Sequence, residues 1–488
     1  MKIHDNNHPK TTNYNNNISS KDNPIYLDEN NSNVELYPTS IIYEEPELHT
    51  TIQNDDPLIK TFERFKKKVG RGSIFNSTIT LISFSPLVIM FYSRYAYVIT
   101  GISYSLILII IFALNSFFSL YINIQAITLT HSENFHTLIK NKIRNNTLLY
   151  IYHICSFVYL LTLSVLCNFA LIEMIKHIFY ALSFECNLTS KIVCISIVFI
   201  FVQIPYLFKP NFTVSQVISI GLLALIFLSG ITLILELIFF NDINQQLKVF
   251  PEFKLQFGVS VCIFSFLFNN SINLIKEVKV MNYYTYKRGQ SLIQRTIVLE
   301  WVLYIIYTLF SYLNDTISIS DSTEEPLVHF ITLHRQYKNY PMILFEIVSS
   351  ICLGFKTCSY SYDMVNVLFM NYRENPKNSK IKTALIILIL VIINVLIIVI
   401  KEKYILLIIG IFGCTSGYIL EYAISIYVYN SVFDEDFLEE NKKLIPLQED
   451  QENKRTNTIV ILNYLVAIIM LLLYIFGAVG AIYCAFSN

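Results

Sequence analysis

Charged side chains are rare in the long apolar stretches of this chain, and those that occur there are the first candidates for chemistry. A charge inside lipid costs free energy, so it is retained where it binds a solute, carries a proton or pairs with another charge. The residues within or near such stretches are Glu173, Glu236, Glu300, Glu346, Asp363, Glu421 and Lys356. Of these, Glu173 and Glu236 are better explained as helix-end charges that reach the lipid headgroups.

Three of these residues invite a more specific hypothesis. Lys356 and Asp363 lie seven residues apart on one predicted helix, so they face roughly the same way and a local charge pair is open to them. Glu346 lies toward the outer half of the same helix. There it is either a gating or proton-sensitive carboxylate or a structural hydrogen bonder that faces the interior of the bundle.

The motifs of common enzymes and metal proteins are missing from the sequence. We find no P-loop, no G-x-S-x-G and no H-E-x-x-H motif. No C-x-x-C pair or His/Cys pair has the spacing of a zinc site. We therefore expect no catalytic residue, no metal site and no cofactor, and hence a protein that is not an enzyme.

The overall composition excludes two broad classes of protein. Only 15% of the 488 residues are charged and 54% are hydrophobic, whereas soluble domains carry about 25% charged residues. Lys and Arg together number 36, and so do Asp and Glu, which gives a formal net charge of zero. A nucleic-acid-binding protein would show a basic surplus, so we expect no nucleic-acid partner.

The apolar residues fall into about eleven runs, most of them long enough to cross a bilayer. A soluble protein with many buried helices is the alternative, but one soluble core would hardly bury so many long uncharged runs. The sequence therefore predicts an all-α polytopic membrane protein with about eleven transmembrane helices in contact with lipid. The predicted spans are 74–92, 97–126, 147–177, 191–207, 213–240, 256–275, 291–312, 339–370, 382–400, 404–429 and 457–485.

The first 60 residues differ from the rest of the chain. They are polar and rich in Asn, with no apolar period, so they bury too little surface to offset the entropy of ordering. We expect residues 1–60 to be a disordered cytoplasmic segment, open to a cytosolic partner, and residues 61–488 to form the transmembrane domain.

Basic residues concentrate in one set of predicted loops. With a cytoplasmic N-terminus, the cytoplasmic loops hold Lys140, Lys142, Arg144, Lys209, Lys276, Lys279, Lys287, Arg288, Arg373, Lys377, Lys380 and Lys382. This arrangement obeys the positive-inside rule, although the turn at 401–403 and the acidic loop at 434–440 depart from it. The prediction is an integral protein of the plasma membrane or of a vacuolar or lysosome-like membrane.

Four segments resemble the amino acid/auxin permease family when they are taken in order. Ser73-Ile74-Phe75-Asn76 fits the opening "S-[IV]-F-N" of the family's first helix, and the spacing from Asn76 to Gly101 matches without a gap. The segments at 258–279, 358–369 and 406–430 are similar to the family's sixth, eighth and tenth helices. The resemblance covers about residues 70 to 488.

The resemblance implies a LeuT-like fold, an inverted repeat of five plus five helices with one extra helix. In that fold the first helix of each repeat breaks at mid-membrane, and the half-helix ends present partial charges to a substrate or ion. The breaks would fall at Ser83, Phe84 and Ser85 in the first repeat and at Asn269, Asn270 and Ser271 in the second. Thr415 and Ser416 in the tenth helix would lie near the same cavity, or would hydrogen-bond to neighbouring helices.

Several positions depart from the family pattern. Its Gly-small-Gly break is replaced by Ser83-Phe84-Ser85, which admits a ligand less closely to the backbone. The Asn that serves the ion site of sodium-coupled relatives aligns with Ile79, and their Thr falls near Leu353, with Ser349 and Ser350 one turn away. The sequence therefore predicts transport without sodium, either coupled to protons or facilitative.

The resemblance and the polar breaks together predict transmembrane transport of amino acids by alternating access. The carboxylate of the amino acid would meet a half-helix end near Ser83–Ser85, with Asn269–Ser271 on the opposing broken helix. One alternative is a carrier of another small solute on the same fold. Another is an amino-acid-sensing transceptor that signals through its N-terminus and the loop at 431–456.

Overall fold

The computed structural model describes most of the chain after residue 72. The described residues are 73–84, 86–130, 132, 135–182, 188–208, 248–281, 286–313, 340–369, 376–400, 402–432 and 457–486, with scattered residues between 220 and 238. All of them belong to the unit Pro57–Asn488, which is distinct from Met1–Asp56. The predictions for residues 1–60, most of the span 213–240, Ser85 and the loop beyond 432 lie outside the described residues.

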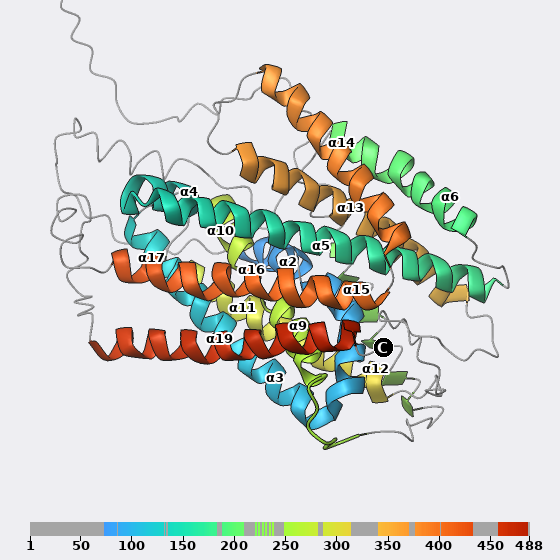
Figure 1. Cartoon of the computed structure of the whole chain (residues 1–488), viewed down its shortest axis with the longest axis horizontal. Coiled ribbons are helices and arrows are strands. Elements are labelled where there is room, and N and C mark those ends of the chain that lie inside the picture. Colours follow the sequence, from blue (N-terminus) through green and yellow to red (C-terminus); the bar gives the residue numbers. More distant parts are fainter. Residues whose placement is uncertain are drawn as a thin grey trace, which may run out of the picture. The chain divides into compact units, whose positions relative to one another are not determined.

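Regular secondary structure in this described part is helical, apart from one isolated bridge residue at Met281. Figure 1 shows the described helices, and short π-helical segments, written η below, interrupt several of them. In chain order the elements are α2 (Ile74–Phe84), α3 (Pro86–Thr130), α4 (Phe135–Thr137), η1 (Leu138–Ile143), α5 (Asn146–Ala181), α6 (Leu188–Val198), η2 (Phe199–Gln203), α7 (Ile204–Phe208), α9 (Phe257–Leu267), α10 (Ser271–Val280), α11 (Tyr286–Tyr304), η3 (Ile305–Leu309), α12 (Phe310–Leu313), α13 (Tyr340–Phe369), α14 (Pro376–Val399), α15 (Glu402–Leu407), η4 (Ile408–Cys414), α16 (Thr415–Tyr418), η5 (Ile419–Ala423), α17 (Ile424–Val432) and α19 (Asn457–Phe486).

Within the described residues, seven helical stretches are long and apolar enough to cross a membrane. They are Tyr95–Thr128, Asn146–Lys176, Leu188–Leu207, Tyr286–Leu309, Lys380–Val399, Tyr404–Val432 and Ile461–Phe486, and each coincides with one predicted span. The prediction of an all-α polytopic membrane protein is confirmed. The span at 339–370 corresponds to α13, which carries Glu346, Lys356 and Asp363.

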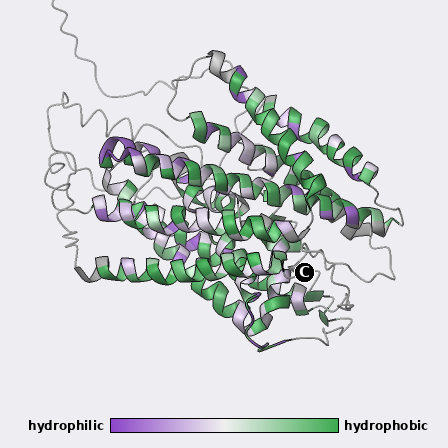
Figure 2. Cartoon of the chain, viewed as in Figure 1, coloured by the Kyte–Doolittle hydropathy of each residue, from purple (hydrophilic) through white to green (hydrophobic). Residues whose placement is uncertain are grey.

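Apolar residues make up most of the described helices, as Figure 2 shows, and many of their side chains are exposed. On α19, Ile461, Leu472 and Phe486 are among the many exposed apolar side chains, and Val399 at the end of α14 is 75% exposed. Such surfaces are stable in contact with lipid chains rather than water. Hydrophilic residues gather instead at helix ends, for example around α4 and η1.

The predicted boundary between the first two spans is a kink rather than a loop. Helix α3 runs from Pro86 to Thr130, and only Gly101 inside it departs from helical geometry, with a φ of 70°. A Cβ at this position would lie 2.4 Å from the carbonyl oxygen of Lys248. The amide of Ile102, which follows the kink, donates to that same oxygen at 3.0 Å. Only glycine tolerates both the backbone angle and the close approach.

Three helix pairs form the framework of the described bundle. Helix α5 packs along α13, while α9 packs against both α3 and α19. The approach of α9 to α19 is close because glycines face each other there. A Cβ at Gly258 would lie 2.4 Å from the carbonyl oxygen of Phe476 and 2.8 Å from the Cα of Gly480.

The second of the two helices that the sequence predicts to break is interrupted. Helix α9 ends at Leu267 and α10 begins at Ser271, so Phe268, Asn269 and Asn270 form a non-helical link. The break predicted at Ser83–Ser85 includes Ser85, which lies outside the described residues. Helix α10 packs against α2, so the link lies close to that segment.

Candidate functional site

The link between α9 and α10 leaves backbone carbonyl oxygens without a partner in their own helix. Three hydroxyl groups from three other helices donate to these carbonyls. Tyr304 donates to the oxygen of Leu267 at 2.9 Å, Ser116 to that of Phe268 at 2.5 Å, and Tyr159 to that of Asn269 at 3.2 Å. A non-helical backbone inside a membrane protein persists only when it is satisfied in this way.

The two asparagines of the link connect it to two further helices. The amide nitrogen of Asn269 donates to the carbonyl oxygen of Gly417 at 3.4 Å. The amide nitrogen of Asn270 donates to Oε1 of Glu300 at 2.6 Å. Both side chains are buried, as is that of Ser271. The structure therefore places the predicted triplet Asn269–Ser271 inside the bundle, against α11 and the tenth span.

Two buried carboxylates flank this link. Glu300 of α11 binds Asn270, and Glu421 lies one turn beyond Gly417 on the tenth span. Tyr474 donates to Oε2 of Glu421 at 3.3 Å, and Ser119 donates to the backbone oxygen of Glu421 at 2.5 Å. Both carboxylates are fully buried and lie close enough to interact electrostatically.

Four buried polar atoms around the link have no hydrogen-bond partner among the described residues. They are Oδ1 of Asn270, Oγ of Ser271, Oε2 of Glu300 and Oε1 of Glu421. Buried polar groups in native proteins are nearly always hydrogen-bonded, so a cluster of such atoms has the capacity to hold a ligand. These four residues, together with Asn269, form the candidate site.

The remaining predicted site residues lie elsewhere or outside the described residues. Ser83 and Phe84 end α2, but their side chains are not described, and neither is Ser85. Ser416 is buried, and its hydroxyl binds the carbonyl oxygens of Phe412 and Gly413 in its own helix. The side chain of Thr415 is exposed. We therefore leave Thr415 and Ser416 out of the candidate site.

The other charged residues within the predicted spans form separate groups. Lys356 is buried and interacts with both Asp363 and Glu277 of α10, so the expected pair with Asp363 belongs to a wider cluster. Glu173 lies near the end of the stretch Asn146–Lys176, where it is buried and forms an ion pair with Lys176. The side chain of Glu346 is buried on α13. Glu236 lies outside the described residues.

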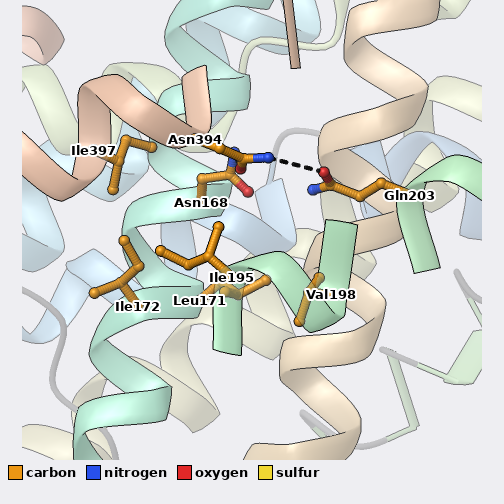
Figure 3. A pocket seen from close by; sticks show the side chains of 8 residues that line it. All are labelled: Asn168, Leu171, Ile172, Ile195, Val198, Gln203, Asn394 and Ile397. Carbon is orange, nitrogen blue, oxygen red and sulfur yellow. Dashed lines mark hydrogen bonds between the residues drawn. The ribbon is translucent and has the colours of Figure 1, made fainter. Parts of the chain in front are cut away.

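A second polar group joins α5, α13, α14 and η2 (Figure 3). Thr357 donates to Asn168 at 3.1 Å, Asn168 to Asn394 at 3.1 Å, and Asn394 to Gln203 at 3.2 Å. The adjoining cavity has room for about one water molecule. This cavity is too small for a solute, so helix–helix hydrogen bonding accounts for Asn168. No group of three or more potential metal ligands occurs among the described residues.

Most of the side chains that hydrogen-bond to the link could not be predicted from the sequence. Glu300 and Glu421 are flagged because they are charges in apolar runs. Ser116, Tyr159 and Tyr304 carry no such signal, because the chain has 33 tyrosines and their partners are backbone atoms far along the sequence. Their positions relative to the link become apparent only in the folded structure.

The chain is similar to solved structures but matches no family model and no curated protein. Among solved structures, it is similar to a Na+-coupled sialic acid symporter, with 10% identity, a TM-score of 0.47, and 88% of this chain and 94% of that chain covered. It is also similar to the manganese transporter of Eremococcus coleocola, with 9% identity, a TM-score of 0.43, and 89% and 97% covered. Both TM-scores are below 0.5, so the fold rests on the chain's own helices.

Proposed function

We propose that this protein transports amino acids across a membrane by alternating access, with the substrate bound at the link between α9 and α10. The observation that carries the proposal is the interrupted helix itself. Buried polar atoms without partners surround it, inside a bundle of apolar helices. Irregular backbone at membrane depth occurs where it lines a cavity, and discontinuous helices mark the binding sites of many transporters.

The two half-helices offer complementary charges to a zwitterion. The end of α9 carries the partial negative charge of a helix C-terminus, and the start of α10 carries the partial positive charge of an N-terminus. An amino acid carboxylate would be stabilised by the start of α10 beside Ser271. Its ammonium group would lie toward the carboxylates Glu300 and Glu421.

The contacts of the half-helices support relative movement. Helix α9 is held between α3 and α19 through the close glycine contacts, whereas α10 is a ten-residue helix that packs against α2. The link between them is the natural hinge, because its three residues are outside helical geometry. A movement of α2 and α10 against the fixed α9 would open the site to one side at a time.

We propose that sodium is not the coupling ion. The positions at which sodium-coupled members of the amino acid/auxin permease family carry ion-binding side chains hold Ile79 and Leu353, and both are buried here. Apolar side chains cannot replace the oxygen ligands that a hard cation requires. Either proton coupling or facilitated transport is consistent with this.

An uptake screen tests the proposal. The purified chain is reconstituted in liposomes, and uptake of each amino acid is measured with and without imposed sodium and proton gradients. We expect uptake of at least one amino acid that persists when choline replaces sodium. Uptake that collapses in choline contradicts sodium independence. No uptake of any amino acid, with binding of a cytosolic partner that depends on amino acids, would favour the sensor alternative.

A single substitution tests the site. In Asn269→Ala the link loses its bond to the carbonyl oxygen of Gly417, so we expect uptake to fall by about tenfold or more with normal insertion. Asn115→Ala is the matched control, because the amide of Asn115 donates only to Ile111 of its own helix. Equal uptake by the two variants contradicts the proposed site.

A further inference from the structure

We infer that the site at the link selects amino acids with a cationic side chain, such as lysine, over neutral and acidic ones. This inference rests on the proposed function and names its substrate class. It begins from two buried carboxylates in one place. Glu300 touches the link through Asn270, and Glu421 lies one turn from Gly417, which accepts from Asn269.

The neighbours of these carboxylates neutralise little of their charge. The amide of Asn270 donates to Glu300, and the hydroxyls of Tyr474 and Ser116 interact with Glu421, so every one of these donors is neutral. Among the described side chains, Lys356 is the one buried Lys or Arg, and it interacts with Glu277 and Asp363 instead. Two like charges in a buried site raise each other's cost, and a bound cation removes that cost.

The acceptors without partners among the described residues match an ammonium group in number. An ammonium donates three hydrogen bonds and accepts none. Oδ1 of Asn270, Oε2 of Glu300 and Oε1 of Glu421 are three buried acceptors without partners among the described residues. Ser271, at the start of α10, leaves its hydroxyl for the substrate carboxylate.

Charge balance separates basic from neutral substrates. A neutral amino acid brings one ammonium and one carboxylate, so it leaves the negative charge of the site unchanged. Lysine brings one further ammonium and compensates one of the two carboxylates. An acidic amino acid adds a third carboxylate and is the least favoured of the three.

Uptake measurements in liposomes test the inference. Uptake of labelled lysine, leucine and glutamate is measured at equal pH on both sides, with the membrane potential clamped. We expect the apparent KM for lysine to be lower than that for leucine by about tenfold or more, which is the contribution of one charge-assisted hydrogen bond. If leucine is carried as well as lysine or better, the inference fails and the proposed function stands. If none of the twenty amino acids is carried, the proposed function itself fails.

Variants of Glu421 separate charge from structure. In Glu421→Gln the ratio of lysine to leucine uptake should fall about tenfold, because the amide keeps the acceptor for Tyr474 but loses the charge. Glu421→Asp should retain the preference. Glu173→Gln is the control, since that carboxylate pairs with Lys176. Thermal unfolding of each variant checks that it folds.

Two other occupants of the carboxylates would overturn the inference. If lysine uptake requires sodium, the carboxylates hold that ion. If leucine uptake follows an inward proton gradient, and Glu421→Gln abolishes that dependence without changing selectivity, the carboxylates carry protons instead.

Discussion

At the scale of the residue, a few buried atoms carry the electrostatic cost of the candidate site. Glu300 and Glu421 are buried, and each has one carboxylate oxygen without a hydrogen-bond partner among the described residues. A buried polar group without a partner costs about 1–3 kcal/mol, and more when it is charged. A ligand that satisfies these atoms therefore stabilises the folded protein as it binds.

The pair His136 and His153 should make the free energy of unfolding depend on pH. Nδ1 of His136 lies 3.0 Å from Nε2 of His153 in α5, and the His136 side chain is buried. Burial, together with the charges of His153 and Lys140, lowers the pKa of His136 to about 4. The unfolded chain then binds more protons than the folded chain between about pH 6.5 and pH 4. The contribution of His136 to the free energy of unfolding should be complete above about pH 6.5 and should be lost as the pH falls toward 4.

Thermal unfolding in detergent at pH 7.5 and pH 5 measures this effect. We expect the Tm of the wild type to fall at pH 5, and His136→Gln to show a smaller fall because it cannot gain that proton. A fall of the same size in both proteins would show that His136 does not set the pH dependence.

The candidate site is only partly predictable from single residues. Asn269, Asn270 and Ser271 stand out because three polar residues in a row interrupt an apolar run. Thr415 carries the same signal, but its side chain is exposed, because a polar residue in an apolar helix does not reveal which face it occupies. The helix rotation is set by packing, which the sequence does not display.

At the scale of the element, the packing of the Phe266 ring against Gly413 positions the link. Phe266, two residues before the link, stacks on Tyr159 with a centroid separation of 5.2 Å and an interplanar angle of 7°. Its ring fills the space left by Gly413 in the π-helical segment η4. Such π-helical segments occur frequently at functional sites. The stack fixes the end of α9 against the tenth span.

Gly413→Ala tests this packing. The added Cβ would lie 1.9 Å from the Phe266 ring, which is buried and cannot move away from Tyr159. We expect a loss of about 1–3 kcal/mol in the free energy of unfolding, as for other overpacked cores. Gly221→Ala is the control, since nothing lies within 4 Å of a Cβ there. Equal stability of the two variants would contradict the packing described.

The helices themselves were largely predictable, and their irregularities only in part. Runs such as 382–400 are long and uncharged, so their identity follows from composition. The link at 268–270 follows from polar residues and the family resemblance. The π-helical turns, however, arise from contacts between helices and leave no local pattern in the sequence.

At the scale of the described molecule, the exposed surface is apolar, unlike that of a soluble protein, and polar residues are buried within a mainly apolar interior. The exposed faces of α14 and α19 are apolar, while buried asparagines and glutamates lie among the helices. This arrangement suits a bundle in lipid whose interior handles a polar solute. The account predicts that the buried link becomes accessible from each side of the membrane in turn.

Cysteine labelling at the link measures this most directly. Ser271→Cys is nearly isosteric, and the described native cysteines are buried or half-buried. Sealed vesicles carrying this variant or the wild type are treated with a membrane-impermeant thiol reagent from either face, with and without amino acids. The account predicts labelling above the wild-type level from both faces, reduced by a transported amino acid. Labelling from one face only, or no more than in the wild type, would contradict it.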